Sequence, residues 1–218
     1  MFWDRVAGVY DIFANGINRK ANRALCAAVG EWITPTDRVL ECACGTGLLS
    51  GVIAARCREL IATDVSVPML KRAKQKCRQY PNAHFEPADI LQLRFPDGSF
   101  DVVLSRNLTW TLPDPEKAYS QWLRVLRRGG LLLNFDADYA ANVRSESTQN
   151  CSVPPDSPYG HVGMTRELVE ENNAITLALD IGKRRPDWDA AVLEKMGAVH
   201  CTVDRTLGRR ILGELDLE

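Results

Sequence analysis

The sequence lacks the features of a membrane-anchored or exported protein. None of its apolar runs approaches the roughly 20 residues that a helix needs to cross a bilayer. The first ten residues, MFWDRVAGVY, carry Asp4 and Arg5 in place of the apolar stretch of a signal peptide. We therefore expect a soluble, cytoplasmic protein without a membrane partner.

The sequence also lacks an excess of charge of one sign. Lysine and arginine number 27 and aspartate and glutamate 28, for a net charge of −1. A non-specific nucleic-acid-binding protein needs a basic surface to displace the counterions of its ligand. The composition therefore predicts no nucleic-acid partner and leaves a small-molecule or protein substrate open.

The seven cysteines show no C-x-x-C spacing of the kind that zinc and redox sites use. Cys42 and Cys44 are two positions apart in an apolar stretch, and on a strand they would point to the same face. A metal pair is one interpretation of this spacing, and small buried core residues are the one we favour. We expect no metal site, and free thiols that suit a reducing cytoplasm.

Short apolar runs alternate with helical patterns along most of the chain. Residues 1–36 predict a helical cap that ends at Thr34-Pro35-Thr36, and residues 37–218 the main domain. This alternation predicts an α/β fold with a doubly wound, mostly parallel sheet and helices on both faces. The predicted strands are 38–42, 59–63, 83–86, 100–105 and 131–135, and the predicted helices are 48–56, 67–78 and 115–127.

The composition changes after Asp136. Residues 137–163 are rich in Ser, Asn, Pro and Gly, which predicts a lid-like insertion. Helices are expected at 164–179, with Thr165 as N-cap, and at 188–196. Two further strands, at 199–203 and 210–212, would complete a seven-stranded sheet.

The strongest local signal is a turn rich in small residues between the first strand and its helix. Glu41-Cys42-Ala43-Cys44-Gly45-Thr46-Gly47 lets the backbone turn sharply and approach a ligand. Asp64 ends the next strand, where an acid suits two ribose hydroxyls. Together these features predict an adenosine-containing cofactor.

Two features of this turn argue against a dinucleotide. The segment does not match G-x-G-x-x-G, the pattern that places a helix N-terminus against a pyrophosphate. Glu41 would oppose a pyrophosphate but would suit the ammonium group of an amino acid. S-adenosylmethionine (SAM) carries an ammonium and a sulfonium and has no phosphate.

Three segments in order resemble the motifs of class I SAM-dependent methyltransferases of the small-molecule type. They are VLECACGTGLLS, ATDVSVPMLKRA and the stretch PADILQLRFPDGSFDVVLSRNLTWTLPDPEKAYSQWLRVLRRGGLLLNF. The resemblance covers residues 37–136 well and the flanks only loosely. It implies a Rossmann-like methyltransferase fold, SAM as cofactor with S-adenosylhomocysteine as product, and transfer of a methyl group to a small-molecule acceptor.

The resemblance also implies how the cofactor is held. The methionine end would contact the backbone near Arg106 and the turn formed by Glu41, Ala43, Cys44, Gly45 and Gly47. Asp64 would bind the ribose, and Val65 and Met69 would flank the adenine. Asp89 would accept from the adenine amino group, with Ile90 packed on the ring.

Each of these roles has a structural alternative. Asp64 could instead cap the helix that follows it, and Asp89 could close a turn, but we favour the cofactor role for both. For Met69, packing in the core is an equally good interpretation. Ala43 stands where the family usually has glycine. Alanine is small enough for this position if its φ is negative, so we expect it to be tolerated.

The acceptor site is less defined. Trp110 is a candidate wall of the acceptor pocket, although core packing would account for it equally well, and the lid contributes Tyr159 and His161 as further candidates. Tyr10 is a candidate for closing over SAM, with packing on the sheet as the alternative. No residue can be assigned as a general base, and none is required unless the acceptor must lose a proton.

Other functions compete with this prediction. A nicotinamide-dependent oxidoreductase would bind NADH but not SAM. A SAM-binding protein without transferase activity would keep the acidic residues that bind the cofactor but would give no methylated product. An aminopropyltransferase would prefer decarboxylated SAM.

Overall fold

The computed structural model describes residues 1–11, 19–141, 143–144, 165–179, 182 and 184–207. Tyr159, His161, the predicted strand at 210–212 and most of the predicted lid lie outside these residues. Within the described part, no helix is long and apolar enough to cross a membrane.

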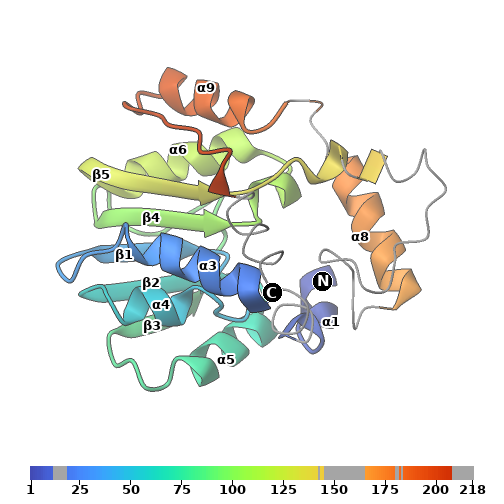
Figure 1. The fold of residues 1–218 in the computed structure, drawn as a ribbon, viewed down its shortest axis with the longest axis horizontal. Coiled ribbons are helices and arrows are strands. Elements are labelled where there is room, and N and C mark those ends of the chain that lie inside the picture. The colour runs from blue at the N-terminus through green and yellow to red at the C-terminus, as the bar shows by residue number, and fades with distance from the viewer. Residues whose placement is uncertain (12–18, 142, 145–164, 180–181, 183, 208–218) are drawn as a thin grey trace.

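A parallel sheet of five strands forms the centre of the molecule (Figure 1). Its order is β3-β2-β1-β4-β5, and every neighbouring pair is parallel. All strands therefore place their carboxyl ends at one edge. The strands are β1 (Arg38–Cys42), β2 (Glu59–Asp64), β3 (Ala83–Pro87), β4 (Phe100–Arg106) and β5 (Leu126–Phe135).

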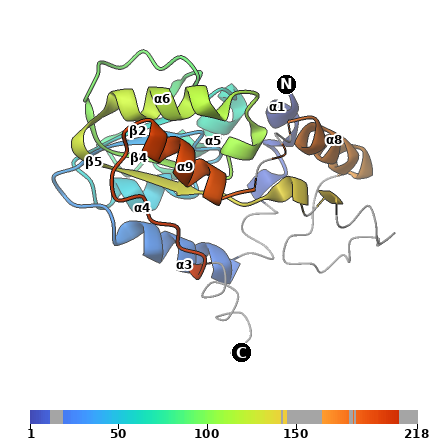
Figure 2. The same ribbon diagram turned by 90° about the horizontal axis from the view of Figure 1, so that it is seen from above.

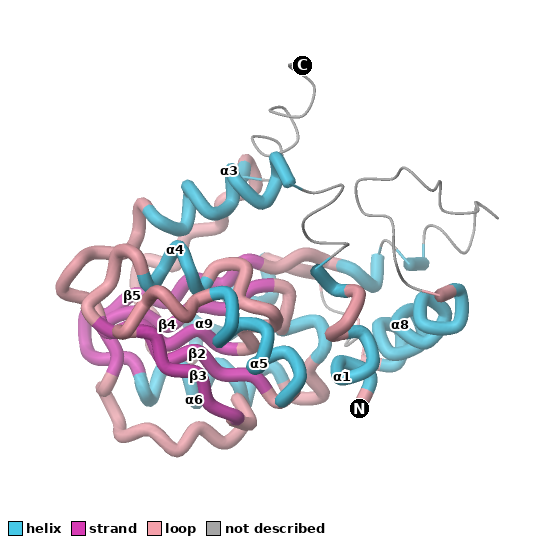
Figure 3. Tube along the Cα trace, turned by 90° about the horizontal axis from the view of Figure 1, so that it is seen from below, coloured by secondary structure: helices cyan, strands magenta, loops and turns pink. Residues whose placement is uncertain are grey.

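Helices cover both faces of the sheet (Figure 2, Figure 3). One face packs against α3 (Arg19–Gly30), α4 (Ser50–Ala54) and α5 (Val67–Lys76). The other packs against α6 (Pro115–Val125) and α9 (Asp187–Lys195). The central strands are therefore apolar on both sides, which explains their near-continuous hydrophobic runs.

Successive side chains of β1 point to opposite faces of the sheet. Val39 faces the cluster under α3, α4 and α5, and Leu40 faces the cluster under α6. Both side chains are 0% exposed. Leu40 lies in the same cluster as the buried Trp122 of α6, so burial of apolar side chains holds the sheet between its helices.

Two helices lie beyond the carboxyl ends of the strands, α1 (Phe2–Val6) and α8 (Arg166–Ala178) (Figure 1). They contribute to a third apolar cluster, in which Phe2, Val6, Ala7 and Met69 are buried and Leu168 and Ile175 pack against them. The Thr165 hydroxyl accepts from the Leu168 N–H, so the predicted N-cap of α8 is confirmed.

The doubly wound α/β architecture is confirmed, but the described residues contain five strands where seven were predicted. The prediction for 199–203 was wrong, because this segment forms no strand and Val199 is 78% exposed. The fifth strand begins at Leu126, five residues before the predicted start. The Gly129-Gly130 pair lies inside that strand, beside an irregularity in its pairing with Phe100 and Val102.

Candidate functional site

The turn after β1 is built from left-handed backbone. Ala43 has φ 55°, Gly45 φ 56° and Gly47 φ 82°. The negative φ on which the tolerance of alanine depended is therefore not found at Ala43. Alanine in this region costs about 1–2 kcal/mol because Cβ crowds the following carbonyl oxygen, so the turn holds Ala43 in a strained conformation.

The two glycines serve different purposes. A Cβ on Gly47 would lie 3.0 Å from both Cα and Cβ of Ala73, so Gly47 permits close packing of the turn on α5. A Cβ on Gly45 would meet nothing within 4 Å. The backbone of Gly45 therefore faces open space that a ligand can enter.

Glu41 lies near the carboxyl end of β1 and is 3% exposed. Its Oε2 accepts a hydrogen bond of 2.6 Å from the Ser50 hydroxyl at the start of α4. Burial raises the pKa of Glu41 to about 8, against the opposing effect of that hydrogen bond. The carboxyl group is thus poised to ionise when a cation is placed beside it.

Asp64 closes the same turn from the end of β2. Its Oδ2 accepts from the Gly45 N–H at 2.9 Å, and its Oδ1 accepts from the Ser66 N–H at 2.8 Å. A carboxylate has about four acceptor positions, so these bonds leave room for two more donors. The N-cap of α5 is Ser66, whose hydroxyl accepts from the Met69 N–H, so the capping alternative for Asp64 is wrong. Burial raises the pKa of Asp64 above its usual range.

A pocket at this edge gathers six of the residues predicted for the cofactor. Its walls include an acid, a base and an aromatic ring, from Glu41, Arg106 and Tyr10. The predicted Ala43, Cys44 and Gly45 line it too, together with three residues that were not predicted: Thr46, Leu48 and Leu49.

The remaining predicted cofactor residues lie outside this pocket. Val65 is 46% exposed and follows Asp64 directly. Met69 is 2% exposed and packs with Phe2 and Val6, which matches the core alternative. The cofactor roles of both residues stay predictions.

Asp89 and Ile90 are placed beside β2, because the Ala88 N–H donates to the Asp64 carbonyl at 3.2 Å. The exposed Asp89 accepts from the Leu91 N–H at 2.9 Å, so it closes a turn as the alternative proposed. Ile90 is 5% exposed and lies in the α6-side cluster. These contacts place both residues at the same sheet edge as Asp64.

The N-terminal segment is fastened to the glycine-containing turn. The Thr46 hydroxyl donates to Asp11 at 2.6 Å, and Lys76 of α5 also donates to Asp11, at 2.5 Å. Asp4 accepts from the Ser66 hydroxyl at 2.6 Å. Sequence reasoning missed these contacts because the partners are far apart in the chain.

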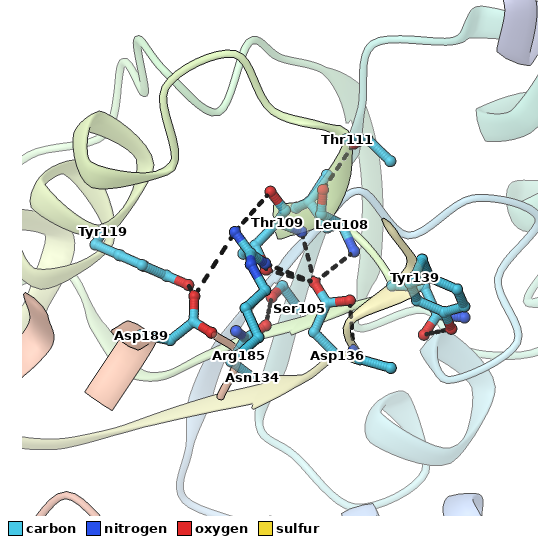
Figure 4. Close-up of polar contacts among 12 residues, drawn as sticks. Ser105, Leu108, Thr109, Thr111, Tyr119, Asn134, Asp136, Tyr139, Arg185 and Asp189 are labelled. Carbon is cyan, nitrogen blue, oxygen red and sulfur yellow. Dashed lines mark hydrogen bonds and ion pairs between the residues drawn. The ribbon is translucent and has the colours of Figure 1, made fainter. Parts of the chain in front are cut away.

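A buried polar network follows the ends of β4 and β5 (Figure 4). Asp136 accepts from the N–H groups of Leu108 and Thr109, at 3.2 and 2.7 Å, and from the Thr109 hydroxyl. Arg185 donates to the same hydroxyl and lies 3.8 Å from Asp136. The network thus holds the loop after β4. The sequence analysis did not predict this network, although the position of Asp136 directly after a parallel strand could have marked it as a candidate functional residue.

The network continues to α6 and α9. Arg185 lies 3.7 Å from Asp189, which accepts a 2.5 Å hydrogen bond from the Tyr119 hydroxyl. Side chains of Arg185, Asp136 and Asp189 are at most 8% exposed. Burial raises the pKa of both aspartates, against the opposing effect of the arginine.

Three aromatic rings lie beside this loop. Trp110 is 6.5 Å from Trp3 and 4.9 Å from Tyr139, measured between ring centroids. The Tyr139 hydroxyl donates to Asn107 Oδ1 at 2.9 Å. The buried indole nitrogen of Trp110 has no hydrogen-bond partner in the described part of the chain. Trp110 is therefore part of an aromatic cluster, and its role in acceptor binding stays a prediction.

Cys42 and Cys44 are both buried, as the core interpretation expected. They belong to clusters on opposite faces of the sheet, so the expectation that they share a face was wrong. The left-handed Ala43 between them breaks the strand geometry. Burial raises the pKa of both thiols, so neither is primed for chemistry.

Comparison with known proteins finds a matching family model and similar sequences. Residues 40–134 match the family described as methyltransferase domain. The chain is 36% identical over 135 residues to a demethylmenaquinone methyltransferase of Renibacterium salmoninarum, covering 60% of this chain and 55% of the relative. It is 32% identical over 125 residues to a phosphatidylethanolamine N-methyltransferase of Cereibacter sphaeroides, covering 56% and 60%.

The fold has solved counterparts of similar length. The YcgJ protein of Bacillus subtilis superposes with a TM-score of 0.52 at 20% identity, over 90% of this chain and 84% of that protein. This likeness shows the fold alone. The aligned segments span only 55% and 60% of the two curated relatives' length.

Proposed function

We propose that this chain is a class I methyltransferase, which binds SAM and transfers the methyl group to a small-molecule acceptor; the match of residues 40–134 to a methyltransferase domain supports this proposal. The observation that carries the proposal is the buried carboxyl group of Glu41, which lines the pocket beside the left-handed turn.

The residues of the pocket fit SAM better than a dinucleotide. A pyrophosphate beside Glu41 would face a buried carboxyl group and would oppose its ionisation. An ammonium group there would stabilise the carboxylate instead and offset its desolvation. This difference argues against the nicotinamide-dependent alternative.

The nucleoside part would lie beyond the turn. Asp64 has acceptor positions left for ribose hydroxyls, because its two observed bonds come from backbone N–H groups. The exposed Val65 and the segment with Asp89 and Ile90 would flank the adenine at the same edge, with Met69 beneath. Gly45 and Gly47 would let the cofactor approach the backbone.

When bound, SAM would supply a methyl group already activated by its sulfonium. The protein must then mainly hold the acceptor in line with that methyl group. The network of Asp136, Thr109 and Arg185 fixes the loop that carries Asn107 and Trp110. We propose that this loop forms the wall against which the acceptor is positioned.

The names of two relatives support a small-molecule acceptor while leaving its identity open. The two curated relatives are named for different acceptors, demethylmenaquinone and phosphatidylethanolamine. Acceptor choice therefore differs among proteins that share this domain. We propose that residues 1–36 cap the cofactor, with Tyr10 on the pocket wall, and that the lid-like 137–163 segment, with Tyr159 and His161, contributes to acceptor choice.

A thermal-shift panel with SAM, S-adenosylhomocysteine and NADH tests the cofactor assignment. A ligand at a hundred times its dissociation constant stabilises a protein by about 2.7 kcal/mol, which for a chain of this size raises Tm by roughly 5–10 °C. We expect this shift with both adenosyl ligands and not with NADH. Asp64→Ala should abolish it, whereas the exposed Asp97→Ala, in the turn before β4, should leave it unchanged.

Transferase activity needs a separate test. SAM with a labelled methyl group should yield labelled product with some member of a panel of phenolic, quinol, amine and thiol acceptors. Binding of SAM without product across that panel would instead favour a SAM-binding protein that lacks transferase activity.

A further inference from the structure

Helix α5 carries positive charge and no acid. Its sequence, VPMLKRAKQK, contains lysine or arginine at four positions, and Arg78 follows in the turn after it. The whole chain has a net charge of −1, so this concentration of cations is local. The helix packs on the edge strands β2 and β3, beside α1, with its other side toward solvent (Figure 3).

The cations of this segment fall into two groups. Arg72 and Lys76 pair with an aspartate of the N-terminal segment. Lys71, Lys74 and Arg78 are exposed, and among the described residues none of them has an ion pair or a hydrogen bond. Lys71 and Lys74 are three positions apart, so they lie on the same side of the helix. This side of α5 therefore presents uncompensated positive charge.

Exposed apolar side chains continue this side of α5 toward the carboxyl edge of the sheet. Val67, at the start of the helix, is 64% exposed, and Val65 is 46% exposed. Met1 is 60% exposed. Its amino group lies 3.6 Å from Asp4, which accepts from the hydroxyl of Ser66, the residue between the two valines. The three apolar side chains therefore gather at one end of the cationic side.

Among the described residues, the edge strand beside α5 offers no acid to this side of the helix. β3 carries a single acid, Glu86. Phe85 packs in the cluster under α5, so the alternation of side chains along β3 places Glu86 on the opposite face of the sheet. The free lysines are therefore open to an anionic partner.

We propose that this surface, which we call the docking face, binds the protein to an anionic lipid surface. The docking face consists of Met1, Val65, Val67, Lys71, Lys74 and Arg78. Aliphatic side chains enter the boundary between headgroups and acyl chains, while lysine and arginine remain beside the charged headgroups. A nucleic acid would fit less well, because the docking face has no aromatic side chain on which a base could stack.

Peripheral binding of this kind needs no spanning segment. The expectation of no membrane partner rested on the lack of such a segment and did not consider the surface. Val67 lies three positions after Asp64, at the edge of the sheet that holds the candidate cofactor site. Docking would therefore set that site against the bilayer, where an acceptor dissolved in lipid would reach it without crossing water. This consequence rests on the proposed function, whereas docking itself does not.

Sedimentation with sucrose-loaded vesicles measures docking without any cofactor. Vesicles of equal parts phosphatidylglycerol and phosphatidylcholine should bind the chain at least about tenfold more tightly than vesicles of phosphatidylcholine alone, because each lysine or arginine near an anionic surface strengthens binding about fivefold. Raising the salt from about 0.1 M to about 1 M shortens the Debye length to about 3 Å and should remove most of this preference.

Variants then assign the binding to the docking face. Lys71→Gln with Lys74→Gln should weaken binding to the anionic vesicles by about 10- to 30-fold. Val67→Ser should weaken it by about 3- to 10-fold, because the valine no longer leaves water. Lys117→Gln with Lys195→Gln is the matched control, since it removes the same charge from exposed side chains of α6 and α9, on the other face of the sheet. Unfolding curves confirm that each variant folds.

Several results would overturn the docking face. They are equal binding to both kinds of vesicle, equal losses in the α5 pair and the control pair, and an unchanged affinity in Val67→Ser. Tighter binding to a duplex DNA oligonucleotide than to anionic vesicles, lost in the α5 pair, would assign the surface to nucleic acid instead. A chain that SAM stabilises but that does not sediment with anionic vesicles would lose this inference and keep the proposed function.

Discussion

Binding of S-adenosylhomocysteine should release a proton, because the cofactor site contains a carboxyl group that is largely neutral when empty. Burial raises the pKa of Glu41 to about 8, so at pH 7 about nine tenths of the molecules carry the proton. The ligand's ammonium group favours the ionised form. Close to one proton should therefore leave the protein for each ligand bound at pH 7.

The same linkage sets the pH dependence of affinity. Below the pKa of Glu41 in the free protein, the dissociation constant should fall by up to about tenfold for each unit by which the pH rises. Above that pKa, the dissociation constant should no longer depend on pH. Between pH 6 and pH 8 the predicted gain in affinity is therefore tens-fold. Glu41→Gln cannot titrate, so it should bind weakly and with little pH dependence over this range.

Calorimetric titration in two buffers of different ionisation enthalpy measures the proton count directly. The difference in observed enthalpy between the buffers should correspond to nearly one proton released at pH 7 and much less at pH 9. A wild-type chain that released no proton at pH 7, with constant affinity from pH 6 to pH 8, would refute the placement of the ammonium at Glu41.

Further predictions concern stability and can be checked by urea unfolding. Ala43→Gly should stabilise the chain by about 1 kcal/mol, since relief of the left-handed strain exceeds the added entropy of the unfolded chain; a loss of stability would contradict the strain at φ 55°. Gly47→Ala should destabilise by about 2 kcal/mol or more, because its Cβ would meet Ala73 at 3.0 Å, and a neutral effect would exclude that close packing. Arg185→Met should lower the free energy of unfolding by about 3–5 kcal/mol, because it leaves buried carboxylates unpaired. This loss should shrink as the pH falls and those carboxyl groups take up protons. A loss that does not change with pH would argue that the arginine acts through packing alone.

Glu41 also makes a prediction for the free protein. Its pKa when folded is raised above the ordinary value of 4.5, so the stability it contributes is fully present below about pH 4.5 and is lost as the pH rises through about 8. Glu41→Gln should therefore lose less stability than the wild-type chain between pH 5 and pH 8. Identical pH profiles for the two proteins would show that the pKa of Glu41 is not raised.

The central sheet could be predicted from the sequence because its strands are buried on both faces. Runs such as RVLEC at residues 38–42 and FDVVLS at 100–105 are apolar throughout and bounded by turn residues. The segment 199–203 contains similar residues but forms no strand, and none of the five strands among the described residues pairs with it. Local composition cannot distinguish these cases, because a strand exists only where another strand pairs with it.

The residues of the candidate site likewise divide into those that the sequence predicts and those that it does not. Glu41, the turn and Asp64 could be predicted because each follows a parallel strand, and the carboxyl ends of parallel strands share an edge. The contact of Asp11 with Thr46, 35 positions later, depends on how the N-terminal segment docks. The positive φ of Ala43 was missed because alanine rarely adopts it, and only the close packing of the turn reveals it.

A crystal structure of the chain with S-adenosylhomocysteine would test the central claim most directly. The account predicts the ligand at the carboxyl edge of the sheet, with its ammonium at Glu41, its ribose hydroxyls at Asp64 and its adenine beside Asp89 and Ile90. A ligand bound away from the turn after β1, or one whose ammonium faces away from Glu41, would contradict it.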